Sequence, residues 1–478
     1  MSFPRYRDIA EQLLAAMARG DYPPGSRLPS VRQLAASCAV NSLTALQAYR
    51  WLEQQQRVEA RERSGFYAIQ PGERQREPVP PSPPAPPGTW VQVDDHVANL
   101  LSLSGSSIAT QLHMAECDDS LYPSAELSRR LQHKLAHDAS LIGAHLPNAV
   151  RHALYGGLQH LADEWQMSLP ADQLTMTNGC TEAIQLALRS LTRPGDVVAV
   201  ETPVYFGLLQ TIESLGLRVL EIPCTPSEGI SLEALAFALR QGPPVRCLVA
   251  VANFQNPTGS LMPDDSKRRL VEMMRRHDIP IIEDDVFGDL YFGSDHPKPL
   301  KAWDRDGGII YCSSFTKSFA PTLRLGWFSG GRYHRRMERL KVSNSFATSS
   351  LLQATIADCL NSGLYDRQAA RLRQHLREQA RRMQSAVLEA FPLDTRIVAP
   401  QGGMLMWVEC PETVDTLALL QRALQASISF APGMVFSAEP HFRRHLRLSV
   451  GYPWTDRQAD AIRTLGELAK GAQRASLL

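Results

Sequence analysis

The sequence predicts an α/β protein in which a mostly parallel sheet lies between helices, preceded by a small α+β module. Three observations support this prediction. A proline-rich segment at residues 71–88 divides the chain into a short part and a long part. The short part has three helical apolar stripes followed by a hairpin pattern. The long part alternates apolar strand-like runs with helical patterns.

The overall composition is that of a globular protein. The chain has 478 residues, of which 44% are hydrophobic and 21% charged, and its formal net charge is +1. No run approaches the ~18 apolar residues of a membrane span, and the amino terminus has no apolar export segment. We therefore expect a cytoplasmic protein with no membrane partner. Any attraction for nucleic acid has to be local.

Eight cysteines are scattered along the chain, with no Cys-x-x-Cys pair and no histidine spacing typical of zinc. We expect reduced, mostly buried thiols and no metal site.

The proline-rich segment is the predicted domain boundary. Residues 71–88 contain eight prolines, which cannot sustain a helix or a central strand. We therefore assign a linker to residues 71–90, between a module at residues 1–70 and a body at residues 91–478. Proline-rich chain favours an extended conformation, so this linker should keep its two neighbours apart.

The module has the pattern of a winged helix-turn-helix. Ser30 can cap the second of three helices, and alternating stretches at 57–60 and 65–69 predict a hairpin with its tip at 63–65. The third helix would lie in the major groove. Residues 1–70 hold nine arginines and no lysine against six acidic residues, a modest local excess of positive charge. The predicted core positions are Ile9, Leu13, Leu14, Met17, Val31, Leu34, Ala35, Cys38, Ala45, Tyr49 and Leu52.

Residues 24–35 of this module read Pro-Gly-Ser-Arg-Leu-Pro-Ser-Val-Arg-Gln-Leu-Ala, followed by Thr44, Ala48-Tyr49 and Ser64-Gly65. In order and spacing this resembles the operator-binding signature of the GntR family. Two recognition-helix positions that are often basic in that family are Ser42 and Leu46 here. The alternative is an oligomerisation cap with an incidental wing. The DNA contacts that the resemblance implies come from Arg32, Thr44, Ser64 and Gly65.

Four separated motifs in the long part point to a ligand site. Residues 177–184 form a small-residue turn that opens a helix after the strand-like residues 173–176, and free amides at a helix start attract phosphate. The turn at residues 253–259 follows an apolar strand and carries Asn256, which no turn requires.

The other two motifs each follow a buried-looking strand. Residues 279–282 run into Asp284, which places a carboxylate at the strand end where ligands bind in open α/β sheets. Residues 309–314 lead to Lys317, with Arg324 seven positions later. This spacing suits an amine that forms an imine beside a phosphate.

Together these motifs resemble the fold-type I aminotransferases that depend on pyridoxal 5′-phosphate (PLP), over roughly residues 110–455. The resemblance implies that Lys317 forms the internal aldimine and that Asp284 keeps the pyridine nitrogen protonated. A carboxylate favours the charged form of the ring nitrogen, and a pyridinium is the better electron sink. It also implies a large part at about 150–345 and a small part at about 110–149 with 346–478.

The same resemblance assigns the remaining site residues. Asn256 would donate to the 3′-oxygen of the ring, and Tyr205 would stack on the ring face, although an ordinary core aromatic is the alternative. Arg447 would bind a substrate α-carboxylate, with a surface arginine as the alternative. The residues implied for the phosphate are Gly179, Cys180, Thr181, Ser314 and Arg324.

Two features depart from the aminotransferase pattern. The family usually has a tyrosine three residues after the pyridine aspartate, and this position is Phe287 here. With one donor fewer, we expect a higher aldimine pKa than in tyrosine-bearing relatives. The segment 145–150, ahead of Tyr155, also lacks the usual tyrosine and glycine. Cofactor binding is therefore expected, whereas efficient turnover is not.

The order of module, linker and body resembles the MocR subfamily of bacterial transcriptional regulators. The resemblance implies a homodimer that binds double-stranded DNA and senses PLP or an amine or amino acid effector through an aldimine at Lys317. Two alternatives stay open: a working aminotransferase with a vestigial module, and a body that serves only as an assembly scaffold. Six arginines at residues 367–382 indicate either a second DNA surface or a solvated helix face.

Overall fold

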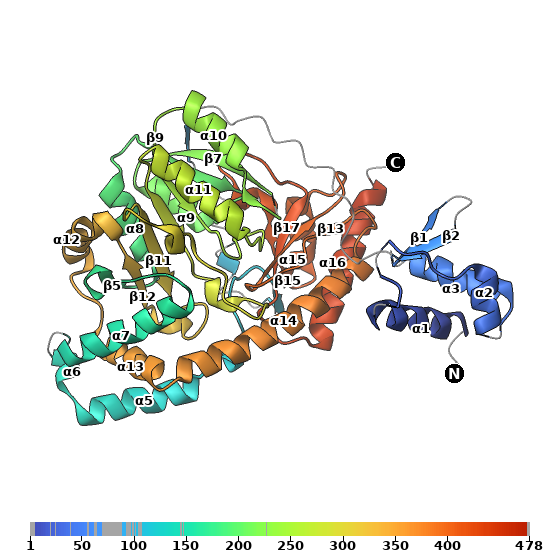
Figure 1. Ribbon diagram of the computed structural model, residues 1–478, viewed down its shortest axis with the longest axis horizontal. Helices are drawn as coiled ribbons and strands as arrows, with labels where there is room; N and C mark the ends of the chain where they lie inside the picture. Colours follow the sequence, from blue (N-terminus) through green and yellow to red (C-terminus); the bar gives the residue numbers. More distant parts are fainter. Residues whose placement is uncertain are drawn as a thin grey trace. The chain divides into compact units, whose positions relative to one another are not determined.

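The computed structural model forms two units, Met1–Pro80 and Pro81–Leu478, which are described separately (Figure 1). Residues 71–87 of the predicted linker and residues 63 and 64 of the predicted hairpin tip lie outside the described residues. Among the helices that the structure describes, none has the length and hydropathy of a membrane span. The described residues are 5–19, 21–23, 25–38, 40–54, 57–61, 65–68, 88–91, 97, 100, 102–103, 108–143, 146, 148–225 and 227–475.

The first unit has the predicted three helices and hairpin. Ser30 caps α2 because its side chain accepts from the Gln33 amide while the Gln33 side chain accepts from the Ser30 amide. Strands β1 and β2 pair in antiparallel fashion. The elements are α1 (Arg5–Arg19), α2 (Val31–Ser37), α3 (Ser42–Gln54), β1 (Val58–Arg61) and β2 (Gly65–Ala68).

The core of this unit is built on α3. Ala45, Tyr49 and Leu52 are fully buried, as their helical spacing predicts. The Tyr49 ring stacks on Phe66 of the hairpin at 4.3 Å between centroids, and its hydroxyl donates to the carbonyl of Pro29 at 2.5 Å. The aromatic contact ties the wing to α3, so the helix and the hairpin form one packed module.

The second unit is organised around a nine-stranded sheet of order β3-β7-β6-β9-β10-β11-β12-β5, with β8 paired to β7. Strands β7, β6, β9, β10 and β11 are parallel neighbours, and β12 runs antiparallel to β11 and to β5. The strands are β3 (Thr89–Trp90), β5 (Leu174–Thr177), β6 (Val197–Thr202), β7 (Arg218–Thr225), β8 (Gly229–Ile230), β9 (Val245–Ala250), β10 (Ile281–Asp284), β11 (Ile309–Ser314) and β12 (Gly326–Ser329).

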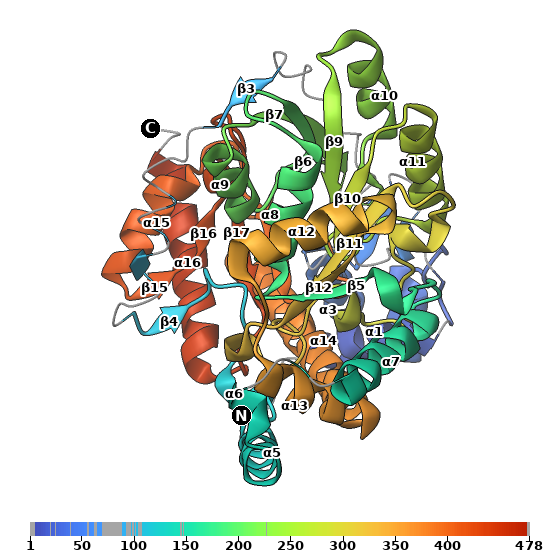
Figure 2. The same cartoon turned by 90° about the vertical axis from the view of Figure 1, so that its left-hand side faces the viewer.

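Helices cover both faces of this sheet (Figure 2). Because side chains alternate along a strand, Ile282 and Ile310 pack into the core with α8, α9 and α12. Their neighbours Ile281 and Ile309 pack into the core with α10 and α11. The helices are α7 (Asn148–Glu164), α8 (Cys180–Leu191), α9 (Phe206–Ser214), α10 (Leu232–Gln241), α11 (Asp264–Arg276), α12 (His334–Ser345) and α13 (Ser350–Asn361).

A second, four-stranded sheet has the order β13-β14-β17-β16 and packs with α14, α15 and α16. The long helix α14 carries the six arginines noted in the sequence and buries Leu372, Leu376 and Met383, as predicted. The remaining elements are α5 (Ser124–His137), α6 (Ser140–Gly143), α14 (Leu364–Ala390), α15 (Thr416–Gln425), α16 (Asp456–Ala475), β4 (Thr110–Gln111), β13 (Arg396–Ile397), β14 (Leu405–Glu409), β15 (Ile428–Ser429), β16 (Ala431–Pro432) and β17 (His445–Ser449).

Candidate cofactor site and DNA-binding surface

The cofactor site predicted from the sequence lies at the carboxyl ends of two adjacent parallel strands. Asp284 is the last residue of β10 and pairs in register with Cys312 of β11. Lys317 follows three residues after β11 ends at Ser314. Neighbouring parallel strands end at the same edge of a sheet, so the acid and the amine come from one edge although 33 positions separate them.

Lys317 is held by a segment far away in the sequence. Its Nζ donates to the backbone carbonyl of Ala115 at 2.8 Å. Burial lowers the pKa of Lys317 most, and the nearby cations Arg447 and Arg324 lower it further, while Glu116 opposes them. A lowered pKa increases the fraction of neutral amine, which is the nucleophilic form.

Asp284 sits in a buried environment of mixed polarity. The Cys180 thiol donates to its Oδ1 at 3.5 Å. Burial raises the pKa of Asp284 to about 6, against the opposing effects of Cys180 and Lys317. A protonated ring nitrogen beside Asp284 would stabilise the ionised carboxylate further, which is what a pyridinium partner requires.

The start of α8 forms a cradle with Arg324. Gly179 has φ +81°, and a Cβ at this position would lie 2.7 Å from Nη2 of Arg324, so glycine permits the guanidinium to approach. A Cβ on Gly326 of β12 would lie 2.5 Å from the carbonyl carbon of Gly179. Free amides and a guanidinium at one helix start fit a phosphate dianion. Thr181 is exposed there, and the Ser314 hydroxyl is 2.5 Å from that of Thr316.

Arg447 and Asn256 meet in the interior. Arg447 is 2% exposed, and its Nη1 donates to Oδ1 of Asn256 at 2.9 Å, while its Nη2 donates to the carbonyl of His113. Its Nε has no hydrogen-bond partner among the described residues. Burial lowers the pKa of Arg447 to about 10. A buried cation with an unsatisfied donor fits an anionic ligand group.

Tyr205 lies just before α9 and is 38% exposed. Gly207 leaves room for the phenol, since a Cβ there would lie 2.5 Å from the Tyr205 ring. Burial has the largest effect on the pKa of Tyr205 and raises it. Arg447 lowers this pKa, whereas Asp284 raises it further. The ring is therefore close to the same charges, and its stacking role stays a prediction.

Two parts of the site were missed by the sequence analysis. Residues 113–116 supply backbone carbonyls to Lys317 and Arg447, and a carbonyl has no signature in the sequence. Glu201 near the end of β6 is 3% exposed and accepts from the Val251 amide at 3.1 Å. Burial raises the pKa of Glu201 to about 8, and Asp284 adds to the rise. The sequence signal that could have revealed Glu201 is an acidic residue directly after the apolar run 197–200.

Phe287 is 2% exposed and packs in an apolar cluster with Phe254 and Leu290. The effect of the missing hydroxyl on the cofactor's titration stays a prediction.

The DNA-binding surface predicted for the first unit is polar but weakly basic. On α3, Ser42, Leu43, Gln47 and Arg50 are exposed, and Arg32 of α2 is also exposed. Gly65 has φ +107° at the start of β2. The Thr44 hydroxyl donates to Oδ1 of Asn41 at 2.9 Å, which fixes the start of α3. Ser64 lies outside the described residues.

The comparisons with known proteins match both units. The model of "Bacterial regulatory proteins, gntR family" matches residues 5–68, and that of "Aminotransferase class I and II" matches residues 133–459. Two Escherichia coli K12 proteins named as uncharacterized HTH-type transcriptional regulators are similar over nearly their whole length. YdcR is 34% identical over 97% of this chain and 98% of its own, and YjiR is 35% identical over the same shares.

Solved aminotransferases share the fold of the second unit. The α-aminoadipate aminotransferase LysN from Thermus thermophilus, solved with N-(5′-phosphopyridoxyl)-L-leucine, has a TM-score of 0.72 and 26% identity. The match covers 81% of this chain and 97% of LysN. Together with the full-length similarity to regulators, these matches show that the chain belongs to the MocR-type transcriptional regulators, in which a GntR helix-turn-helix domain is joined to an aminotransferase class I and II domain.

Proposed function

We propose that this protein is a transcriptional regulator whose aminotransferase-like body binds PLP and responds to PLP or to an amine or amino acid effector. Residues 1–70 would form the DNA-binding domain, residues 71–90 the linker and residues 91–478 the ligand-binding body. The last two linker residues, Thr89 and Trp90, pair with β7 as β3, so the linker would end inside the sheet of the body. Two observations carry the proposal. Asp284 and Lys317 come from the same edge of the nine-stranded sheet, and Arg447 of β17 lies near enough to Lys317 to lower its pKa. The regulator relatives match this chain over nearly its whole length.

PLP is the cofactor that the site supports. When bound, it supplies an aldehyde that condenses with amines and a ring that withdraws electrons. Lys317 would present its amine, Asp284 would hold the ring nitrogen charged, and Asn256 and Tyr205 would contact the ring. The phosphate would bind at Gly179, Cys180, Thr181, Ser314 and Arg324.

The effector would bind beside this cofactor. The unsatisfied Nε of Arg447 provides a donor for an α-carboxylate, and the buried guanidinium favours a charged partner. An amino acid offers both a carboxylate for Arg447 and an amine for the aldehyde. We also propose a cytoplasmic homodimer, because this fold is commonly dimeric and the DNA target is inside the cell.

A second candidate function is amino-group transfer between an amino acid and a 2-oxoacid. The buried Lys317, with its lowered pKa, and Arg447 favour it, because both are groups that such a reaction uses. Phe287 packs in an apolar cluster, at a position where the aminotransferase pattern usually has a tyrosine, and this favours regulation over turnover.

Footprinting of genomic DNA with purified protein, with and without PLP, tests the proposal. We expect PLP to change the footprints of wild type but not those of Lys317→Ala, which lacks the reactive amine. Lys470→Ala, on α16 and away from the site residues, is the matched control and should behave as wild type. Identical wild-type footprints in both conditions would overturn the proposed response to PLP. Rapid transamination without promoter-specific binding would favour the enzyme.

A further inference from the structure

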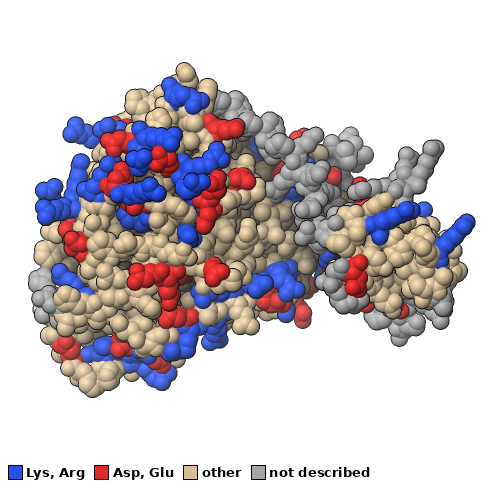
Figure 3. Space-filling view, in the orientation of Figure 1, with Lys and Arg blue, Asp and Glu red and all other residues tan. Residues whose placement is uncertain are grey.

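A groove of about 720 Å³ opens between α10, α11 and the turn Leu300–Trp303. Figure 3 shows basic side chains gathered over this part of the body, with acidic ones among them. Val271, Met273 and Trp303 contribute apolar surface to the groove. None of the cofactor-site residues lines it. The charged residues that line it are Arg240, Arg268, Arg269, Glu272, Arg275, Arg276 and Arg305.

Six arginines against one glutamate make this groove strongly positive. Arg275 and Arg276 share Glu272 and lower its pKa to about 2, so a single acid partly neutralises two cations. Arg268 pairs outside the groove lining with Asp265 at 2.5 Å. In the described part of the chain, the other three lining arginines, at positions 240, 269 and 305, form no ion pair. They are exposed and free to bind an anion.

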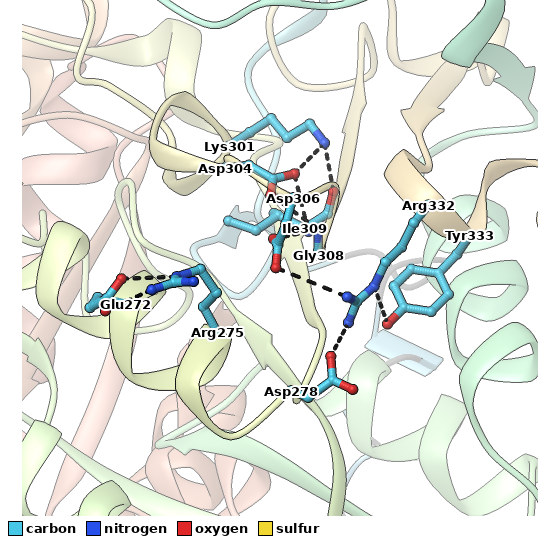
Figure 4. A network of polar contacts seen from close by, with 10 residues as sticks. All are labelled: Glu272, Arg275, Asp278, Lys301, Asp304, Asp306, Gly308, Ile309, Arg332 and Tyr333. Carbon is cyan, nitrogen blue, oxygen red and sulfur yellow. Dashed lines mark hydrogen bonds and ion pairs between the residues drawn. The ribbon is translucent and has the colours of Figure 1, made fainter.

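A rigid frame supports this wall of the groove (Figure 4). Nζ of Lys301 contacts Oδ2 of Asp304 at 2.7 Å and donates to the carbonyl of Ile309 at 2.8 Å. Asp304 also accepts from the amides of Gly308 at 3.0 Å and Ile309 at 3.2 Å. The buried ion pair of Lys301 and Asp304 fixes the turn that precedes Arg305. A preorganised wall lowers the entropy cost of binding a charged ligand.

The charge of the groove contrasts with that of its surroundings. The whole chain has a net charge of +1, and residues 1–70 contribute nine arginines against six acids, which leaves the rest of the chain at −2. The body is slightly acidic overall, yet six arginines line this one groove, and three of them form no ion pair in the described part of the chain. Nothing in the packing requires this, because all six side chains are exposed.

DNA is a polyanion that the first unit is proposed to bind, and its negative charge matches the positive charge of the groove. The exposed face of α3 offers one cation, Arg50, and Arg32 of α2 adds a second, so these two helices supply few phosphate contacts. From Arg268 to Arg276, α11 rises about 12 Å, which corresponds to three or four base pairs of duplex. A row of cations at that scale fits successive backbone phosphates, whose binding is independent of sequence.

We propose that this groove binds the phosphate backbone of double-stranded DNA outside the segment read by the winged helix. Its contribution is electrostatic, so it raises affinity and salt dependence without adding base preference. This inference rests on the DNA binding of the proposed function.

The test compares the full-length wild type with the triple variant Arg240→Gln, Arg269→Gln, Arg305→Gln. The probe is a fluorescently labelled random-sequence duplex of about 60 base pairs. Fluorescence anisotropy measures its affinity for each protein over a range of NaCl concentrations. For the variant we expect about tenfold weaker binding at low salt and a slope of log K against log[salt] smaller by about 2 to 3. The thermal midpoint should not change, because the three side chains are exposed and unpaired.

The triple variant Arg367→Gln, Arg371→Gln, Arg381→Gln on α14 is the matched control, because it removes the same charge from the other arginine-rich surface. It should bind as wild type. Equal affinity and slope for the groove variant and wild type would overturn the groove assignment alone. An equal loss in both triple variants would reduce the effect to net charge and also overturn it. Failure of wild type to bind the duplex would overturn the groove assignment together with the proposed DNA binding.

Discussion

The cofactor site of the body and the DNA-binding face of the first unit use polar residues in opposite ways. In the body, Lys317, Asp284 and Arg447 are surrounded by protein, each contacts a residue from a distant segment, and each has a shifted pKa. On α3, the polar residues Ser42, Gln47 and Arg50 are exposed on a single helix.

This difference indicates how the buried site would select a small ligand and how the exposed helix would bind DNA. A buried site holds its groups in place before the ligand arrives, and desolvation alters their charge states. An exposed helix face leaves its groups hydrated until DNA displaces the water. Substitutions in the body should therefore change binding strongly and locally, while those in the first unit should change it modestly and with a strong dependence on salt.

Asp284→Ala is the largest expected effect and tests the preorganised side of this comparison. Loss of a charged partner for the ring nitrogen should weaken PLP binding about 10- to 100-fold. The stability of the cofactor-free protein should not fall, because burial makes the ionised carboxylate costly. Absorbance titration of the apo-protein with PLP measures the affinity. The exposed Asp295→Asn is the control, and an unchanged PLP affinity in Asp284→Ala would exclude the ring-nitrogen role.

Glu201→Gln tests whether burial, rather than bonding, sets the charge states around the site. The pKa of Glu201 is raised to about 8, so between about pH 4.5 and 8 the folded protein binds a proton that the unfolded chain has lost. Stability contributed by this group therefore falls as the pH rises through that window. Glutamine stays neutral, so the variant should gain roughly 2 kcal/mol in unfolding free energy relative to wild type from about pH 5 to about pH 6.5.

Chemical denaturation at the two pH values measures this difference. The exposed Glu467→Gln should show no such gain. A constant offset between Glu201→Gln and wild type at both pH values would mean that Glu201 titrates normally.

Arg32→Ala is the smallest expected effect and tests the exposed side of the comparison. Removing one phosphate contact should weaken DNA binding across sequences by up to about tenfold at low salt and lower the salt slope by about 1. Anisotropy titration against two unrelated duplexes measures both. Arg422→Ala on α15 is the control for charge. A loss confined to one of the two duplexes would instead assign Arg32 to base recognition.

Much of the fold, and the sheet edge that carries the candidate cofactor residues, was predictable from particular residues. The core positions of the first unit followed from helical spacing, and Ala45, Tyr49 and Leu52 are buried as predicted. Lys317 and Asp284 followed from polar residues placed after apolar strands. The contributions of Ala115 and His113 were not predictable, because they act through carbonyls that every residue carries. The pairing of Cys180 with Asp284 was missed because the two are 104 positions apart.

By itself, the sequence determined the two-part organisation, the family and the residue types of the site, because periodicity, turns and motif spacing are local properties that the chain order records. Only the tertiary structure decided which groups share an environment: that the carbonyl of Ala115 accepts from Lys317, that Arg447 keeps an unsatisfied Nε, and that arginines of α10 and α11 surround one groove. Burial and electrostatic interaction depend on distances through space, and segments far apart along the chain acquire those distances only when the sheet and its helices are assembled.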